Sequence, residues 1–278
     1  MKRNWLKAVV VLVALSLAGN AVAVTWTGAG SDDLWSNPFN WDTGTPPQDG
    51  DGSVSLNANN DAGNDLAVID SSTNVTVNLE IYGPEWGMHL DINGGSLTQI
   101  HTSDPDPWNG FVFAPVADAD AHSTIDVHNG GNLHVQEMLI GDNWWFSGHP
   151  YVDLTVSDTS TVFANGWCWL GGKMNLEGGT VDIGGAMNVA TANGYAGIDI
   201  EDGTLIIRNR FADGRDLAAE AADWYANGYL TGFGGTGLIN IDTTTITDGV
   251  VITATIPEPA TMLIFGLGTL LISRKRKA

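Results

Sequence analysis

The stretch Ile125-Asp126-Val127-His128-Asn129-Gly130-Gly131-Asn132-Leu133 decides the fold, because two short alternating runs flank a glycine turn. Apolar residues alternate with polar ones on both sides of the turn, which indicates strands with one buried face. The glycines supply the backbone angles that a tight turn needs. Related units occur at residues 90–97, 154–162, 174–181 and 198–205.

A strand–turn–strand unit that recurs at a period of about 20–50 residues cannot bury its own apolar face, so its copies must stack. The repeats therefore predict an all-β fold, a β-solenoid in the form of a right-handed parallel β-helix. Its inner ladder would consist of Ile, Val and Leu. The alternative is an antiparallel β-sandwich with glycine hairpins, which the irregular spacing of the units leaves open.

One helical run follows the repeats at residues 216–225, where alanine is abundant. Asp213 or Asp216 can cap its N-terminus, and Gly228 can end it. We expect this short helix to cover the far end of the solenoid. Two final strands are expected at residues 238–242 and 250–254.

The two longest intervals between repeats hold extra loops, at residues 101–122 and 142–151. Insertions in a solenoid project from the stacked body, often on one face. Aromatic rings pack well on sugar rings and on other proteins, so the loop aromatics are candidate ligand contacts. The alternative is that these rings plug the apolar column, because large aromatics are usually buried. The candidates are Trp108, Trp144, Trp145, Phe146 and Tyr151.

The first 23 residues have the pattern of a secretory signal peptide. Basic residues in the first seven positions precede an apolar run at 8–18. Ala21 and Ala23 then provide the small residues that a signal peptidase requires, with cleavage expected after Ala23. The alternative is an uncleaved anchor helix, which the short apolar run disfavours.

The tail combines three parts in a fixed order: Pro257-Glu258-Pro259, an apolar run at 260–272, and a basic stop. The prolines deny the backbone a helix and present an extended stretch. The apolar run is shorter than the ~20 residues that comfortably span a bilayer. A basic cluster would hold the end in the cytoplasm. That cluster consists of Arg274, Lys275, Arg276 and Lys277.

These three parts resemble the PEP-CTERM sorting signal of Gram-negative, exopolysaccharide-producing bacteria. The resemblance covers about the last twenty-two residues and implies recognition by an exosortase, a membrane-embedded cysteine transpeptidase-like enzyme. Cleavage near Pro257, Glu258 and Pro259 would release the protein or transfer it to the surface. The chain is then the substrate of that enzyme. A plain C-terminal anchor is the alternative.

The segment before the repeats is rich in tryptophan, with Trp26, Trp35 and Trp41 followed by Pro46-Pro47. It resembles the opening segment of many secreted solenoid proteins that carry such tails, notably planctomycete-like ones. Aromatic bulk here would close the open end of the solenoid, because an exposed terminal rung is an aggregation edge.

The expected organisation of the chain has five parts. They are a signal peptide (1–23), a Trp- and Gly-rich N-terminal cap (24–65), solenoid repeats (66–210), a C-terminal cap with the short helix and final strands (211–256) and the PEP-CTERM sorting tail with its transmembrane-like helix (257–278).

The body between the two ends is strongly acidic. Residues 24–256 hold 4 Lys and Arg against 31 Asp and Glu, a formal net charge of 4 − 31 = −27. Nucleic acid and anionic lipid are therefore excluded as natural partners, because both would be repelled. Cys168 is the single cysteine, so an internal disulfide is impossible, and it is expected to be a small buried residue.

Metal binding is not expected, apart from a weak structural calcium candidate. Asp49, Asp51 and Ser53 imitate the start of a calcium loop, but Val54 and Asn60 stand where an EF-hand needs glycine and glutamate. The oxygen-bearing side chains that could bind calcium weakly are Asn59, Asp61, Asn64 and Asp65. The evenly spaced His122, His128 and His134 are interpreted as ordinary surface histidines.

Catalysis is not expected from the sequence. No Gly-x-Ser-x-Gly elbow occurs, and Cys168 lacks a histidine placed beside it. Lyase chemistry on acidic polysaccharides needs a base beside clustered carboxylates. The body holds four basic residues, and none of them lies among clustered carboxylates in the sequence. They are Lys173, Arg208, Arg210 and Arg215. Hydrolysis by paired carboxylates stays open.

We therefore expect a secreted structural or adhesive protein of the cell surface or extracellular matrix. It would be exported through the Sec machinery, cut by signal peptidase, held transiently in the inner membrane and processed by an exosortase. Exopolysaccharide is its candidate partner. The alternative is an extracellular β-helix protein that binds carbohydrate or cleaves polysaccharide.

Overall fold

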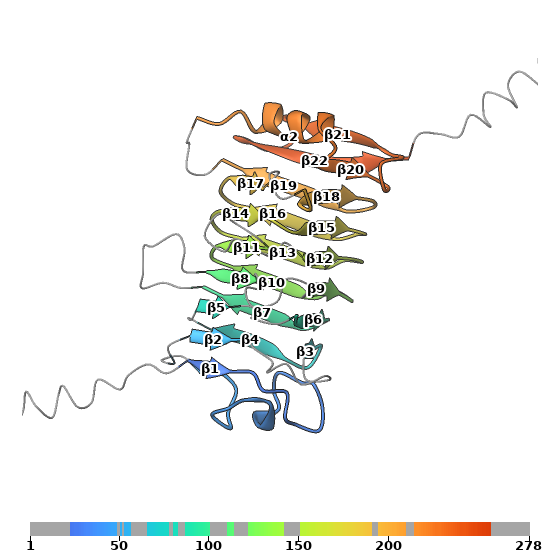
Figure 1. The fold of residues 1–278 in the computed structure, drawn as a ribbon. Helices are drawn as coiled ribbons and strands as arrows, with labels where there is room; N and C mark the ends of the chain where they lie inside the picture. Colours follow the sequence, from blue (N-terminus) through green and yellow to red (C-terminus); the bar gives the residue numbers. More distant parts are fainter. Residues whose placement is uncertain are drawn as a thin grey trace, which may run out of the picture.

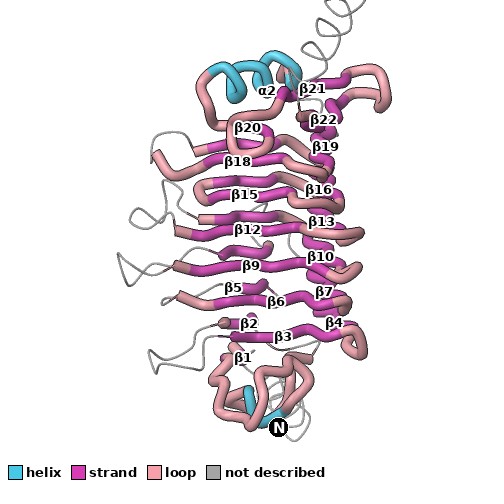
Figure 2. Tube along the Cα trace, turned by 90° about the vertical axis from the view of Figure 1, so that its right-hand side faces the viewer, coloured by secondary structure: helices cyan, strands magenta, loops and turns pink. Residues whose placement is uncertain are grey.

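The computed structural model describes residues 23–48, 51, 53–56, 66–77, 80–82, 87–100, 110–113, 122–141, 151–190, 194–209 and 214–256. These residues form a column of stacked coils, with a loop-rich segment at one end and a helix at the other (Figure 1). The successive coils contribute short strands to three sheets, and the strands of neighbouring coils run side by side (Figure 2).

Sheet 1 has the strand order β1-β2-β5-β8-β11-β14-β17, and all of its pairs are parallel. Its strands are short, with two or three residues each. They are β1 (Val24–Thr25), β2 (Ser53–Ser55), β5 (Glu80–Tyr82), β8 (Phe111–Phe113), β11 (Met138–Ile140), β14 (Cys168–Leu170) and β17 (Met187–Val189).

Sheet 2 has the order β20-β18-β15-β12-β9-β6-β3, again entirely parallel. Its strands are β3 (Leu66–Asp70), β6 (His89–Asn93), β9 (Ser123–His128), β12 (Val152–Val156), β15 (Lys173–Leu176), β18 (Gly197–Ile200) and β20 (Leu230–Gly232).

Sheet 3 has the order β21-β22-β19-β16-β13-β10-β7-β4 and is parallel from β4 to β19. Its strands are β4 (Asn74–Val77), β7 (Ser96–Gln99), β10 (Asn132–Val135), β13 (Thr161–Ala164), β16 (Thr180–Ile183), β19 (Thr204–Arg208), β21 (Leu238–Asp242) and β22 (Gly249–Thr255). The last two strands pair antiparallel, β22 with both β19 and β21.

The parallel sheets identify a β-solenoid and show that the antiparallel sandwich alternative is wrong for the repeats. Each repeat unit is a sheet 2 strand, a turn and a sheet 3 strand, as in β9–β10 and β12–β13. The coils stack in register, so Ile125 lies between Leu90 and Leu154. The same column continues through Met174 and Ile198, and all five side chains are buried.

These apolar columns hold the coils together. Each fully buried aliphatic side chain contributes about 1.5–3 kcal/mol, and sheet 3 supplies a second column parallel to the first. That second column consists of Val75, Leu97, Leu133, Val162, Val181, Leu205 and Ile252.

The glycine pairs at the turns between sheets 2 and 3 have two separate roles. Gly94 and Gly130 adopt φ of 73° and 78°, in the left-handed region that favours glycine. Gly95 and Gly131 lie where coils approach closely. A Cβ on Gly131 would come within 2.4 Å of the Ile92 carbonyl oxygen of the preceding coil.

Three tryptophans are buried in the segment that precedes the repeats. Trp41 makes edge-to-face contacts with Trp26 and Trp35, with centroid distances of 5.1 and 4.8 Å. The Trp41 indole N–H donates to the Trp35 carbonyl oxygen at 2.8 Å. Leu34 forms an isolated parallel β-bridge with Val68 of β3, which connects this segment to the first coil.

The predicted helix near the C-terminal end is confirmed as α2 (Leu217–Ala226). The Asp216 side chain accepts from the Ala219 N–H at 3.0 Å, and Gly228 follows with φ of 77°. Leu217, Ala221 and Trp224 are its buried residues. The helix lies over the end of the column with β20, β21 and β22 (Figure 1).

Candidate functional site

The outward side chains of sheet 2 form a polar face along the column. Because the strands are in register, Asp91, Asp126, Thr155, Asn175 and Asp199 line up in one row. Neighbouring members of such a row lie about 4.8 Å apart, the spacing of paired strands. A second row consists of His89, Thr124, Asp153 and Lys173. We call these two rows, together with His128, the polar face.

Hydrogen bonds between coils organise one end of the polar face. The ring Nε2 of His128 lies 2.7 Å from Asp91 Oδ1, and His89 Nδ1 lies 2.8 Å from Thr124 Oγ1. Thr124 in turn donates to Asp126 Oδ2 at 3.0 Å. The adjacent carboxylates therefore have different hydrogen-bond partners, His128 for Asp91 and Thr124 for Asp126. These side chains line a hollow of about 530 Å³.

The other end of the polar face carries an aromatic ring. The Tyr195 hydroxyl donates to Asp153 Oδ1 at 2.7 Å, and Lys173 Nζ lies 4.5 Å from the Tyr195 ring centroid. Burial, followed by the hydrogen bond and charge of Asp153, raises the pKa of the Tyr195 hydroxyl. Tyr151 packs edge-to-face on this ring at 5.0 Å. A hollow of about 300 Å³ lies beside Tyr195 and Lys173.

Sheet 1 carries an apolar groove on its outer face. Val112, Leu139 and Trp169 occupy equivalent positions on β8, β11 and β14 and pack on one another. Val112 and Leu139 are only 9% and 7% exposed although they point away from the core. The groove has a volume of about 320 Å³. Glu137 and Trp167 also line it.

Glu137 is the carboxyl group of this apolar groove. The Trp167 backbone N–H donates to Glu137 Oε2 at 2.6 Å. Burial raises the pKa of Glu137 to about 7, and the bond from Trp167 opposes that rise. Gly166 leaves the space that the carboxyl group occupies, because a Cβ there would lie 1.9 Å from Oε1.

Cys168 is buried, as predicted, in the inner column of sheet 1. It stacks between Met138 and Met187. Burial, and then the nearby negative charge of Glu137, raise the pKa of its thiol. A thiol with a raised pKa is a poor nucleophile, so this position is structural.

The three evenly spaced histidines are not brought together. His122 Nε2 lies 3.1 Å from Asp153 Oδ2, His128 is paired with Asp91, and His134 packs on Phe163 at 4.8 Å. Within the part of the chain that the structure describes, no group of three His, Cys, Asp or Glu residues is placed to hold a metal ion.

The basic residues of the body are held by separate partners. Arg208 makes two hydrogen bonds of 2.7 Å to Asp182, and Arg215 binds Glu220. Lys173 lies over Tyr195. Arg210 lies outside the described residues.

Most of the residues that the sequence nominated lie outside the described ranges. Tyr151 is described and is 40% exposed, as a ligand contact requires. Ala23 is exposed, and the Asp51 carboxylate accepts from the Gln48 N–H at 2.7 Å. The nominated residues outside the described ranges are Ala21, Asp49, Asn59, Asp61, Asn64, Asp65, Trp108, Trp144, Trp145, Phe146, Pro257, Glu258, Pro259, Arg274, Lys275, Arg276 and Lys277.

Sequence reasoning missed Glu137 and Tyr195. Both lie just before a strand, Glu137 ahead of β11 and Tyr195 ahead of β18. For Glu137, the missing signal is a recognisable strand pattern in sheet 1. The runs Phe111-Val112-Phe113 and Met138-Leu139-Ile140 are three residues long and do not alternate, so the sequence does not mark the strand that follows Glu137.

Comparison with known proteins supports one assignment, at the tail. The family description PEP-CTERM protein-sorting motif matches residues 255–277. No curated protein and no solved structure matches the chain. Among the described residues, no helix is long and apolar enough to cross a membrane, and the expected helix at 260–272 lies outside them. The motif implies export, membrane-associated sorting and processing with the involvement of an exosortase.

Proposed function

We propose that this PEP-CTERM protein is a structural or adhesive component of the cell surface or extracellular matrix. The observation that carries the proposal is the sorting motif at residues 255–277, which begins at the last residue of β22, the final strand of the solenoid. The motif implies export and membrane-associated sorting, and we therefore place the work of the protein outside the inner membrane. The body, residues 24–256, is then the part that acts there.

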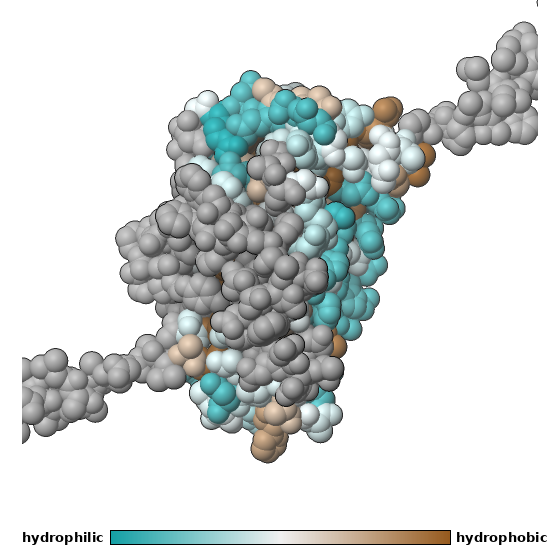
Figure 3. Space-filling view, in the orientation of Figure 1, coloured by the Kyte–Doolittle hydropathy of each residue, from teal (hydrophilic) through white to brown (hydrophobic). Residues whose placement is uncertain are grey.

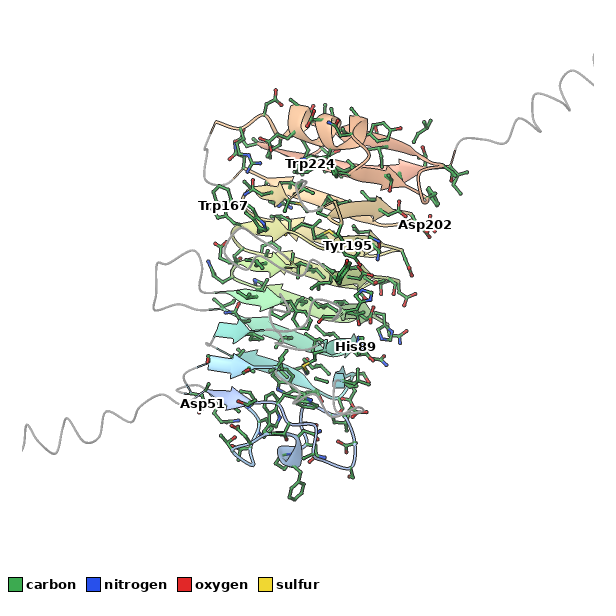
Figure 4. The ribbon with its side chains drawn as sticks, in the orientation of Figure 1. Asp51, His89, Trp167, Tyr195, Asp202 and Trp224 are labelled. Carbon is green, nitrogen blue, oxygen red and sulfur yellow. The ribbon has the colours of Figure 1, made fainter. Side chains whose placement is uncertain are left out.

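The solenoid body suits a structural role. Repeats that bury a continuous core against their neighbours give an elongated body whose faces present side chains at a regular spacing. Hydrophilic residues gather along the turns between sheets 2 and 3, at the right-hand edge of the space-filling view (Figure 3). Asp202 lies on this edge (Figure 4). An acidic surface keeps such a body soluble and favours cationic or neutral partners.

The maturation that we propose has two cuts. Signal peptidase removes residues 1–23 after export through the Sec machinery. The apolar run at 260–272 and the basic stop then hold the protein in the inner membrane until an exosortase cuts near Pro257-Glu258-Pro259. The protein leaves for the surface or the surrounding matrix.

Fractionation of producing cells tests this function. We expect the unaltered protein in the surface or matrix fraction, and the variant Pro257→Ala/Glu258→Ala/Pro259→Ala in the membrane fraction. The control Glu201→Gln/Asp202→Asn alters two exposed turn residues outside the sorting motif and should fractionate as the unaltered protein does. Cells without the protein should lose attachment or matrix cohesion. Unchanged attachment and cohesion would contradict the adhesive role.

The second candidate is a carbohydrate-binding protein, and the polar face favours it. An aromatic ring beside hydrogen-bonding carboxylates is the combination that sugar recognition uses, and Tyr195 has Asp153 and Lys173 beside it. The row of aspartates favours a neutral or amine-bearing polysaccharide. Cleavage by paired carboxylates is the catalytic form of this candidate.

A saccharide-binding assay with the exopolysaccharide of the producing cell tests this candidate. Tyr195→Ala should weaken binding if the polar face is the site, whereas Trp144→Ala/Trp145→Ala should weaken it if the loop is the site. Tyr225→Ala on α2 is the control, because that exposed ring lies on the helix and not on the polar face. The absence of saturable binding would remove this candidate.

A further inference from the structure

We infer that the apolar groove on the outer face of sheet 1 is a binding site for a small organic ammonium ion, one with an apolar or aromatic body and a single protonated amine. The site lies on a different sheet from the polar face and is independent of the tail. It therefore goes beyond the proposed function, and its test does not depend on that function.

The wall of the groove is built to contact an apolar body. Val112, Leu139 and Trp169 project outward from three successive coils, where a solenoid ordinarily presents polar side chains. The space is about 320 Å³, which falls within the range of small-molecule sites. Figure 4 places Trp167, another lining residue, at the opposite edge of the body from Asp202.

The polar end of the groove is a carboxyl group in a fixed position. The Trp167 N–H holds Glu137 Oε2, and the space above Gly166 admits Oε1. Gly110 is required on the other side, because a Cβ there would lie 2.7 Å from the Glu137 Cβ. Among the described residues Oε1 has no hydrogen-bond donor, so it can accept from a ligand.

The chemistry of the lining selects a cation. Indole faces attract ammonium groups, and two tryptophans line the groove beside the carboxyl group. No Lys, Arg or His occurs among the described lining residues. Cys168 is the other titratable group there, and its raised pKa keeps the thiol neutral. The body's charge of −27 adds a general attraction for cations.

The wall also contains an unsatisfied donor. The indole N–H of Trp169 is buried, and no hydrogen-bond partner for it occurs in the described structure. A buried polar group without a partner destabilises a fold by about 1–3 kcal/mol. This nitrogen is enclosed, so a ligand in the groove contacts the indole ring and not its N–H. Tyramine, which combines a protonated amine with an aromatic body, is the probe.

Isothermal titration of the full-length protein with tyramine tests the inference, with 4-ethylphenol as the comparator that lacks the amine. Burial holds the pKa of Glu137 near 7, so the carboxyl group is neutral at about pH 5.5 and ionised at about pH 8.5. The amine stays protonated across this range. We expect tyramine to bind roughly tenfold or more tightly at the higher pH, and 4-ethylphenol to bind more weakly and without pH dependence.

Glu137→Gln is the decisive variant, since it keeps the shape and removes the charge. It should abolish the pH dependence and the proton release that accompanies tyramine binding near pH 7, while circular dichroism shows an unaltered fold. Glu201→Gln, at an exposed turn, should bind as the unaltered protein does. Three results would overturn the inference: no saturable tyramine binding, equal binding of 4-ethylphenol, or undiminished binding by Glu137→Gln.

Discussion

Glu137 shows at the residue scale how a single buried carboxyl group affects the whole chain. Its pKa of about 7 in the folded protein lies above the ordinary value of 4.5. The folded state therefore holds this proton more tightly than the unfolded state does. The resulting stability is fully present below about pH 4.5 and is lost as the pH rises through about 7.

We predict that Glu137→Gln reverses this loss. At about pH 8.5 the free energy of unfolding of the variant should exceed that of the unaltered protein by about 1–2 kcal/mol. This value is already reduced for the partial exposure of the carboxyl group. The advantage should vanish near pH 4.5. Urea denaturation at both pH values measures it. A variant that is less stable at the higher pH would contradict the raised pKa.

Gly166 is the partner of Glu137 in this arrangement. We predict that Gly166→Ala destabilises the fold by about 1–3 kcal/mol, because the new Cβ would overlap Oε1. In a Glu137→Ala background the same change should cost less than about 0.5 kcal/mol. Gly197→Ala is the control, since its Cβ would meet its nearest atom at 3.6 Å. Equal costs in both backgrounds would show that the two residues are not coupled.

At the element scale, the paired strands of sheets 2 and 3 could be predicted from the sequence, and those of sheet 1 could not. Four- to six-residue strands such as β9 and β10 alternate visibly between apolar and polar residues. The strands β8 and β11 have three buried residues each, so alternation is absent. Because Glu137 and the apolar groove belong to sheet 1, this half of the candidate site was invisible in the sequence.

The helix α2 could be predicted because the residues that begin and end it, Asp216 and Gly228, lie beside it in the sequence. We predict that Asp216→Ala lowers the free energy of unfolding by about 1 kcal/mol, since the Ala219 N–H loses its acceptor. Asp202→Ala, at an exposed turn, should change stability by less than about 0.5 kcal/mol. Urea denaturation of both variants compares them. If Asp216→Ala is as stable as Asp202→Ala, the cap contributes nothing.

The tryptophan cluster before the first coil provides a second test at this scale. We predict that Trp41→Ala costs about 3–5 kcal/mol, because the ring contacts both Trp26 and Trp35 and donates a hydrogen bond. Phe39→Ala changes a neighbouring aromatic that is 75% exposed and should be nearly neutral. Thermal denaturation distinguishes them. A small loss from Trp41→Ala would mean that the first coil is stable without this cluster.

At the scale of the whole molecule, the stacked order of the coils followed from the repeats, because no unit can bury its apolar face alone. The position of Tyr195 beside Asp153 did not follow, since 42 residues separate them and register alone brings them together. The right-handed sense of the coils and a structural calcium ion stay predictions.

The central claim is that the tail sorts the protein to the outside of the cell, and an intact mass tests it most directly. The measurement is made on the protein recovered from the surface or medium of the producing cell. We predict a species that begins near Val24 and ends near Pro257, which requires both proteolytic cuts. A species that retains residues 260–278 would contradict the claim, because the tail would then be a permanent anchor.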